Sequence, residues 1–244
     1  MYHFPSLYFF KTIMITIQSL VKSYNNVEIV HIDSLTINTH DCFGLVGNNG
    51  AGKTTLFRLI LDLIKADNGS IVSFDQPVAG NDAWKKYTSS FLDESSLIPF
   101  LTPEEYFSFV GKVYGIYPAD IQQRLAIFES MFNGEVLDQN KLIRDLSTGN
   151  KRKIGIAASL IIQPKVLLLD EPFANLDPSS QIKLVNILKN ISSQKNTTIL
   201  ISSHDLSHIT TVCNRIGLIE KGRIIKDIAT TDDTLRELRQ YFGA

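Results

Sequence analysis

The chain has 244 residues, and its 24 Lys and Arg against 25 Asp and Glu give a formal net charge of −1. This balance excludes a bulk electrostatic attraction to nucleic acid or anionic lipid, so we expect no nucleic-acid partner. With 44% hydrophobic and 20% charged residues, the composition is that of an ordinary globular protein. The length suits one large α/β domain or two small ones.

The two cysteines, Cys42 and Cys213, are too few for a disulfide framework and lack metal-ligand spacing. We interpret them as small, buried apolar residues in a reducing cytosol. The most apolar runs, 154–162 and 166–169, are much shorter than the 18 or more residues of a membrane-spanning helix. The chain itself is therefore not expected to cross a membrane.

Residues 1–13 are aromatic and apolar, but Pro5 interrupts them and they lack the basic start and cleavage site of an export signal. Strand-like alternation begins only at Met14. The first 13 residues are thus either a loose extension or an upstream mis-start of translation. Residues 14–244 contain no linker or internal repeat and are expected to form a single domain.

The first half of the domain starts with strands. Alternating apolar and polar residues predict strands over 15–24 and 28–40, and a short apolar strand over 42–46 runs into glycines. Apolar residues at helical spacing then predict a helix over 54–66. The Asp-Asn-Gly sequence at 67–69 ends that helix.

A helical insert is predicted over about residues 95–162. It contains a capping box at 102–105, with Pro at the first helical position, which opens a helix that ends near Tyr114. Two further helices are predicted over 119–132 and 147–162.

After the insert, buried strands alternate again with helices, which is typical of an α/β sheet. The predicted strands cover 166–169, 198–201, 215–220 and 223–228, and the predicted helices cover 177–193, 205–213 and 232–241.

Residues 47–54, GNNGAGKT, fit the phosphate-binding pattern G-x-x-x-x-G-K-[ST], and they lie between a predicted strand and a predicted helix, as that pattern requires. Its glycines let backbone N–H groups surround phosphate oxygens, Lys53 reaches the β and γ phosphates, and the Thr54 hydroxyl ligates Mg²⁺. We therefore predict ATP and Mg²⁺ as cofactors. The candidate nucleotide-binding residues are Gly47, Asn48, Asn49, Gly50, Ala51, Gly52, Lys53, Thr54 and Thr55.

Two acidic residues follow the buried run Val-Leu-Leu-Leu at 166–169. Asp170 ends the strand at the sheet edge where α/β proteins bind ligands, so we expect it to bind the Mg²⁺ shell. Glu171, one residue further, is the candidate general base that polarises water for attack on the γ-phosphate. The alternative is a pair of surface acids at a strand end.

In this order of motifs, the sequence resembles the ATP-binding subunits of ABC transporters from about residue 14 to 228. Residues 146–150, LSTGN, look like the LSGGQ signature of that family, with Thr for the first Gly and Asn for Gln. The resemblance implies that Ser147 and Gly149 meet a γ-phosphate. Without the other motifs, Ser-Thr-Gly is more often a helix cap.

Three further positions match the family. Residues 175–177, Asn-Leu-Asp, resemble its D-loop, and His204 stands where the switch histidine contacts the γ-phosphate. Tyr24 occupies the position of the aromatic residue that stacks on adenine, although a strand tyrosine could equally pack on the core.

The resemblance implies an α/β fold: a P-loop NTPase (RecA-like) core sheet with an N-terminal antiparallel β subdomain and an inserted helical subdomain. It also implies an ATPase that works as a homodimer or a heterodimer, because the signature helix completes the ATP site of a second subunit. A separate transmembrane permease would hold it at the cytoplasmic face of the membrane. The stretch 101–116, the short insert and the absence of a long C-terminal regulatory domain most resemble the ATPases of ABC-2-type exporters.

One position departs from the family. Asp93 stands where relatives carry the Q-loop glutamine, which contacts Mg²⁺ and water and senses the membrane partner. Either Asp93 makes the metal contact with an added charge, or the alignment is offset and Glu94 does so.

Two other functions compete with transport. Soluble ABC-type ATPases that act on nucleic acid or ribosomes usually carry two cassettes or large inserts, and this chain has neither. An inactive regulatory cassette would lack Lys53, Asp170, Glu171 or His204, and all four are present.

Overall fold

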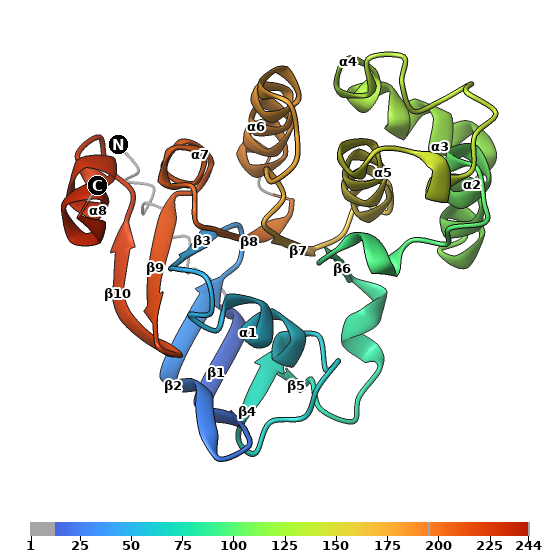
Figure 1. The fold of residues 1–244 in the computed structure, drawn as a ribbon. Coiled ribbons are helices and arrows are strands. Elements are labelled where there is room, and N and C mark those ends of the chain that lie inside the picture. The colour runs from blue at the N-terminus through green and yellow to red at the C-terminus, as the bar shows by residue number, and fades with distance from the viewer. Residues whose placement is uncertain (1–12, 195, 244) are drawn as a thin grey trace, which may run out of the picture.

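Two β-sheets organise the computed structural model, which describes residues 13–194 and 196–243 (Figure 1). The smaller sheet is antiparallel, with strand order β2-β1-β4-β5. Its strands are β1 (Ile13–Tyr24), β2 (Val27–Asn38), β4 (Asn68–Ser73) and β5 (Gln76–Pro77).

The larger sheet has six strands in the order β10-β9-β3-β8-β7-β6. All neighbours in it are parallel except β10, which pairs antiparallel with β9. The strands are β3 (Cys42–Val46), β6 (Thr88–Phe91), β7 (Val166–Asp170), β8 (Thr198–Ser203), β9 (Arg215–Glu220) and β10 (Arg223–Ala229).

Helices cover both faces of this sheet. In Figure 1, α1 (Lys53–Ile60) lies between the two sheets, and four helices lie along the opposite face of the larger sheet. Those four helices are α5 (Thr148–Ile161), α6 (Pro178–Ser193), α7 (Leu206–Val212) and α8 (Thr234–Phe242).

Alternation along the central strands divides the core in two. In β7, Leu167 and Leu169 belong to the core under α5 to α8, whereas Val166 and Leu168 belong to the core shared with α1 and the smaller sheet. Because both faces of this strand are covered, its sequence is continuously apolar.

The helical insert contains α2 (Pro103–Val113), α3 (Pro118–Leu125) and α4 (Glu129–Phe132). Thr102 and Glu105 form the predicted capping box of α2, which confirms its start. The helix predicted over 119–132 is instead broken by a 3₁₀ turn at Ala126–Phe128. Stacked rings of Phe107, Phe128 and Phe132 form the centre of the insert, which is continuous with the core under α5.

The structure also corrects a second predicted helix. The helix over 54–66 ends at Ile60, because Asp62 takes a left-handed conformation (φ 50°) and the chain turns back to pair β4 with β1. Strands β4, β5 and β6 were not predicted.

No helix in the part of the chain described here combines the length and hydropathy needed to cross a membrane. The predicted extension lies outside the described residues, apart from Ile13 at the start of β1.

Candidate active site

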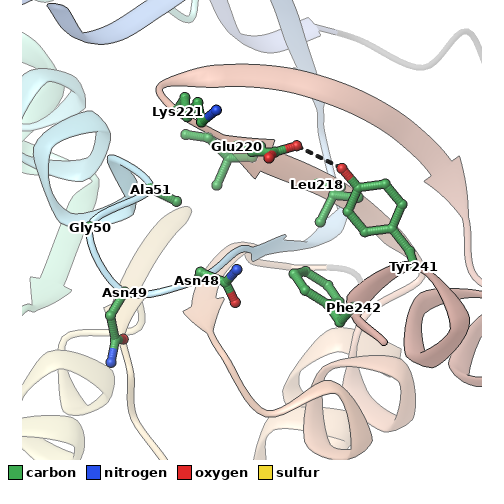
Figure 2. A pocket seen from close by; sticks show the side chains of 10 residues that line it. Asn48, Asn49, Gly50, Ala51, Leu218, Glu220, Lys221, Tyr241 and Phe242 are labelled. Atoms are coloured by element: carbon green, nitrogen blue, oxygen red, sulfur yellow. Dashed lines mark hydrogen bonds between the residues drawn. The ribbon is translucent and has the colours of Figure 1, made fainter. Parts of the chain in front are cut away.

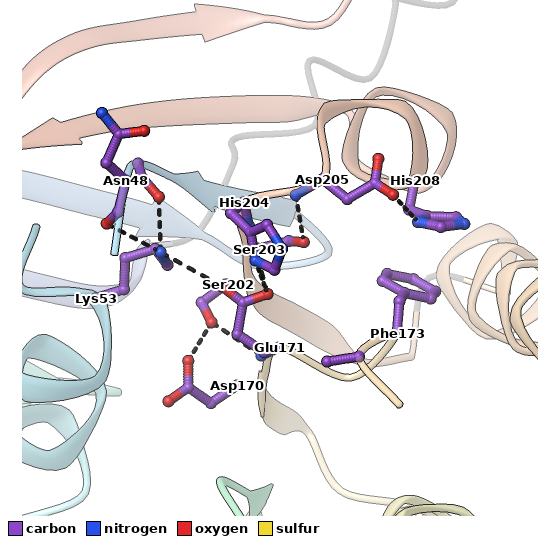
Figure 3. Close-up of polar contacts among 12 residues, drawn as sticks. Asn48, Lys53, Asp170, Glu171, Phe173, Ser202, Ser203, His204, Asp205 and His208 are labelled. Atoms are coloured by element: carbon purple, nitrogen blue, oxygen red, sulfur yellow. Dashed lines mark hydrogen bonds and ion pairs between the residues drawn. The ribbon is translucent and has the colours of Figure 1, made fainter. Parts of the chain in front are cut away.

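The phosphate loop, residues 47–54, meets the ends of β7 and β8 at one edge of the larger sheet (Figure 3). This convergence follows from parallel pairing, since β3, β8 and β7 are neighbours and their carboxyl ends lie at the same edge.

Close packing fixes the backbone of the phosphate loop. A Cβ at Gly47 would lie 2.3 Å from the carbonyl oxygen of Ile219, and Gly52 has a φ of 105°, which favours glycine. Gly52 precedes α1, and no side chain caps this helix. The N–H groups of its first turn can therefore bind an anion such as phosphate.

Lys53 is buried and folds back over this loop. Its Nζ donates hydrogen bonds to the carbonyl oxygens of Gly47 at 2.7 Å and Asn48 at 3.3 Å. The cation is thus held inside the ring of backbone that the sequence assigned to phosphate.

The two predicted metal ligands from the loop and β7 are in contact. Thr54 Oγ1 donates to Asp170 Oδ2 at 2.5 Å, and the Ser202 hydroxyl donates to Asp170 Oδ1. The Asp170 side chain is buried, so these hydroxyls supply the polar partners that a buried carboxylate requires. Oxygen donors of this kind suit Mg²⁺.

Glu171 has a strained backbone, with a φ of 48°. Its N–H donates to the Ser202 carbonyl at 3.1 Å and to the Ser202 hydroxyl at 3.0 Å. Its Oε2 lies 2.9 Å from Nδ1 of His204, and its Oε1 lies 3.3 Å from Nζ of Lys53. Two other predicted site residues, Lys53 and His204, therefore meet at the Glu171 carboxylate.

The second oxygen of this carboxylate is unusual. Oε1 of Glu171 is buried and accepts no hydrogen bond, although the Lys53 ammonium is near. A buried acceptor without a donor carries a free-energy cost, and a water molecule supplied with the substrate would remove it. The donor set around Lys53, Thr54, Asp170 and Glu171 thus fits a nucleotide with Mg²⁺.

Residues 13–194 and 196–243 contain no cluster of three or more His, Cys, Asp and Glu arranged to hold a metal ion alone. An ion at Thr54 and Asp170 would therefore complete its coordination with phosphate and water oxygens, as is usual for Mg²⁺.

The signature segment, residues 146–150, begins α5. Ser147 caps this helix by accepting a hydrogen bond from the Asn150 N–H at 3.2 Å, and its side chain is exposed. A Cβ at Gly149 would lie 2.8 Å from the Asn175 carbonyl oxygen, so glycine permits this close approach. Within the described chain, no hydrogen bond joins Ser147 to the phosphate loop.

Asp177, at the end of the D-loop-like segment, caps α6. It accepts hydrogen bonds from the Ser180 N–H and hydroxyl, and the hydroxyl bond is the main cause that lowers the pKa of Asp177. The segment is therefore anchored to α6 at one end.

Asp93 and Glu94 have different partners. Asp93 caps a 3₁₀ turn by accepting from the Ser95 N–H at 2.8 Å, and its other oxygen lies 4.0 Å from the Arg58 guanidinium. Glu94 forms a 2.8 Å ion pair with Arg152. No hydrogen bond in the described structure connects either carboxylate with Asp170, so the metal contact of Asp93 stays a prediction.

Tyr24 ends β1 beside a two-residue hairpin turn, and 47% of its surface is exposed. It does not pack in the core, and the Lys22 ammonium lies 5.3 Å from its ring centroid. The exposed ring is free to stack, and its assignment to adenine stays a prediction.

A cavity of about 340 Å³ adjoins the outer side of the phosphate loop (Figure 2). Residues 48–51, the end of β9 and the last turn of α8 surround it, and the Tyr241 hydroxyl donates to Glu220 at 2.7 Å. The position of α8 beside the phosphate loop was not predicted from the sequence. The contact of Ser202 with Asp170 was not predicted either, although the polar Ser-Ser-His run after an apolar strand was a signal for it.

Several known ATP-binding proteins are similar to this chain. Residues 30–174 match the family model described as ABC transporter. The linearmycin resistance ATP-binding protein LnrL of Bacillus subtilis (strain 168) is 31% identical, over 90% of this chain and 70% of the relative. The bacitracin transport ATP-binding protein BcrA of Bacillus licheniformis is also 31% identical, over 86% and 67%. The methionine import ATP-binding protein MetN of Clostridioides difficile (strain 630) is 28% identical, over 94% and 74%.

Solved structures show the same fold. A structure described as an ATP-binding subunit of an ABC transporter superimposes with a TM-score of 0.80 at 23% identity, over 94% of this chain and 93% of that one. The predicted fold class is thereby confirmed.

Proposed function

Because the chain belongs to the ABC transporter ATP-binding family, we propose that this ATPase drives export of a substrate through a separate transmembrane permease. The observation that supports the proposal most is the meeting of Lys53, Glu171 and His204 beside the Thr54–Asp170 pair. An ATPase that drives a permease needs a phosphate-binding cation, metal ligands and a general base within one site.

Each residue has a separate task in hydrolysis. Thr54 and Asp170 would hold Mg²⁺, and Lys53, which now binds loop carbonyls, would bind β and γ phosphate oxygens instead. Bound Mg²⁺ supplies charge neutralisation at the terminal phosphates. Glu171 accepts a hydrogen bond, and then a proton, from the attacking water at Oε1, while His204 holds Oε2.

The active complex is a dimer. Ser147 is exposed at the start of α5 and has no hydrogen bond to its own phosphate loop in the described residues. The signature segment is therefore available to a second subunit, whether an identical copy or a related ATPase.

An exposed apolar surface of the helical insert supports a membrane partner. It lies on and next to α2, where aromatic and apolar side chains face solvent instead of the core. This surface, called the α2 surface below, consists of Phe100, Phe109, Val113, Tyr114 and Tyr117. We propose that the permease covers it and so holds the ATPase at the inner face of the membrane.

The names of the relatives favour export over import. LnrL and BcrA, each 31% identical, are named for linearmycin resistance and bacitracin transport, and export of a toxic compound is one way to confer resistance. The methionine import relative is 28% identical. The net charge of −1 gives no support to the alternative of a soluble ATPase acting on nucleic acid or ribosomes.

Co-purification tests the proposal. The tagged chain is isolated from detergent-solubilised membranes of its own cell, next to a Phe109→Asp/Tyr117→Asp variant. Ile182→Asp is the matched control, because Ile182 is an exposed apolar residue of α6. We expect the wild type and the control to retain a polytopic membrane protein that the α2-surface variant loses, while the isolated ATPases remain equally active. Recovery with ribosomes or nucleic acid, or retention by all three proteins, would contradict the proposal.

A further inference from the structure

Arg152 is a buried cation in the second turn of α5, with 6% of its surface exposed. Its Nε and one terminal nitrogen each lie 2.8 Å from Oε1 of Glu94. Its other terminal nitrogen donates to the carbonyl oxygens of Glu171 at 2.7 Å and Ala174 at 3.1 Å. One guanidinium thus joins three segments: α5, the loop after β6, and the loop after β7.

Arg152 binds the backbone carbonyl of Glu171, the candidate base, whose backbone is strained. The N–H of Glu171 is bound by Ser202, and its carbonyl is bound by Arg152. A non-glycine residue with a φ of 48° keeps that conformation only when its surroundings hold it. The backbone orientation fixes where the carboxylate can point, and here it points between Lys53 and His204.

Close packing brings α5 within reach of both loops. A Cβ at Gly155, one turn beyond Arg152, would lie 2.0 Å from the Phe91 ring, so α5 lies directly on the end of β6. At the other end of the helix, Gly149 permits contact with the Asn175 carbonyl. In the segment after Glu171, α5 therefore packs closely on Asn175 and donates a hydrogen bond to Ala174.

We propose that Arg152 is a positioning residue for hydrolysis: it holds the peptide of Glu171 in the conformation that aims the carboxylate at the attacking water. Glu94 is its counterion and orients the fork of the guanidinium, which needs a fixed partner to serve two carbonyls at once. The proposal rests on the assignment of Glu171 as the general base. It gives Glu94 a task that does not involve the metal.

Steady-state ATPase kinetics of the full chain test this role. Arg152→Gln should lower kcat by about 10²-fold, the size expected when a reacting group is misplaced by about 1 Å. Glu94→Gln should lower kcat by about tenfold, as for the loss of an orienting partner. The KM for ATP and the Mg²⁺ dependence should stay near wild type in both variants, because neither residue contacts the phosphate loop.

Arg124→Gln is the matched control. Arg124 also donates from its guanidinium to a carbonyl oxygen of α5, that of Ile161 at 2.6 Å, but at the far end of the helix. Its loss should reduce thermal stability without a selective fall in kcat.

A double variant separates positioning from general damage. In a Glu171→Gln background, adding Arg152→Gln should cost little further kcat, since the group that Arg152 positions is already absent. An equal loss in both backgrounds, or an unchanged kcat in Arg152→Gln, would overturn the inference. If Arg152→Gln does not fold, unchanged kcat in both Arg152→Lys and Glu94→Gln overturns it. Full turnover in Glu171→Gln itself would instead reject the proposed base.

Discussion

Asp170 and Glu171 are adjacent in the sequence, yet their carboxylates have different partners. The Asp170 carboxylate accepts hydrogen bonds from the hydroxyls of Thr54 and Ser202, whereas the Glu171 carboxylate lies between two nitrogen groups, those of Lys53 and His204. The left-handed backbone of Glu171 separates the directions of the two side chains. One carboxylate is thereby suited to a metal and the other to a proton.

At Asp93 we predict an effect on metal dependence. Asp93→Gln removes a negative charge that we expect next to Asp170, so a higher Mg²⁺ concentration should be needed for half-maximal ATPase rate. The measurement is a Mg²⁺ titration at fixed ATP, with Glu94→Gln as the control whose half-maximal Mg²⁺ concentration stays that of the wild type. If only the Glu94 variant shifts it, the assignment in this loop is off by one residue.

The two cysteines should be inert in the folded protein. Cys42 and Cys213 are buried with their sulfurs 3.7 Å apart, and burial raises the pKa of the Cys213 thiol well above its usual value. A raised pKa leaves less of the reactive thiolate at pH 8. Ellman's reagent should therefore react slowly with the native chain and rapidly with both thiols in guanidinium. Rapid stoichiometric reaction of the native protein would contradict this burial.

At the scale of elements, local patterns predicted helices with caps better than they predicted ends set by distant pairing. Thr102 and Asp177 are N-cap residues whose hydrogen-bond partners lie three residues further along the chain, so the adjacent sequence is enough to predict where α2 and α6 begin. The end of α1 depends on pairing between β1 and β4, with the Asp67 N–H donating to the Val21 carbonyl. No local pattern contains that information, and the missed strand β4 has the same cause.

Thr102→Ala should destabilise the chain by about 1 kcal/mol, because it removes the side chain that accepts from the Glu105 N–H in the capping box. Chemical denaturation measures this loss, with the exposed Lys112→Ala of the same helix as the control. A free energy of unfolding equal to that of the control would show that the cap contributes nothing.

In the whole molecule, the candidate active site lies at the carboxyl ends of the parallel strands, where segments far apart in sequence meet. Motif order predicted that the phosphate loop, Asp170, Glu171 and His204 lie together, because each stands at or just after the end of a strand in one sheet. The contacts of Arg152 were not predicted, since its partners Glu94, Glu171 and Ala174 lie on two separate loops and no spacing rule links them to α5.

We propose an ATPase whose site is completed by a second subunit and whose attacking water is activated by Glu171. The test measures the molar mass of the Glu171→Gln variant in MgATP by light scattering after size exclusion, together with its ATP turnover. We predict a shift from monomer to dimer mass with only a small residual turnover, because the variant keeps Lys53, Thr54 and Asp170 but lacks the base. Lys53→Ala/Glu171→Gln should stay monomeric, since it lacks the phosphate-binding cation. A monomer mass for Glu171→Gln with undiminished ATP turnover would contradict the account.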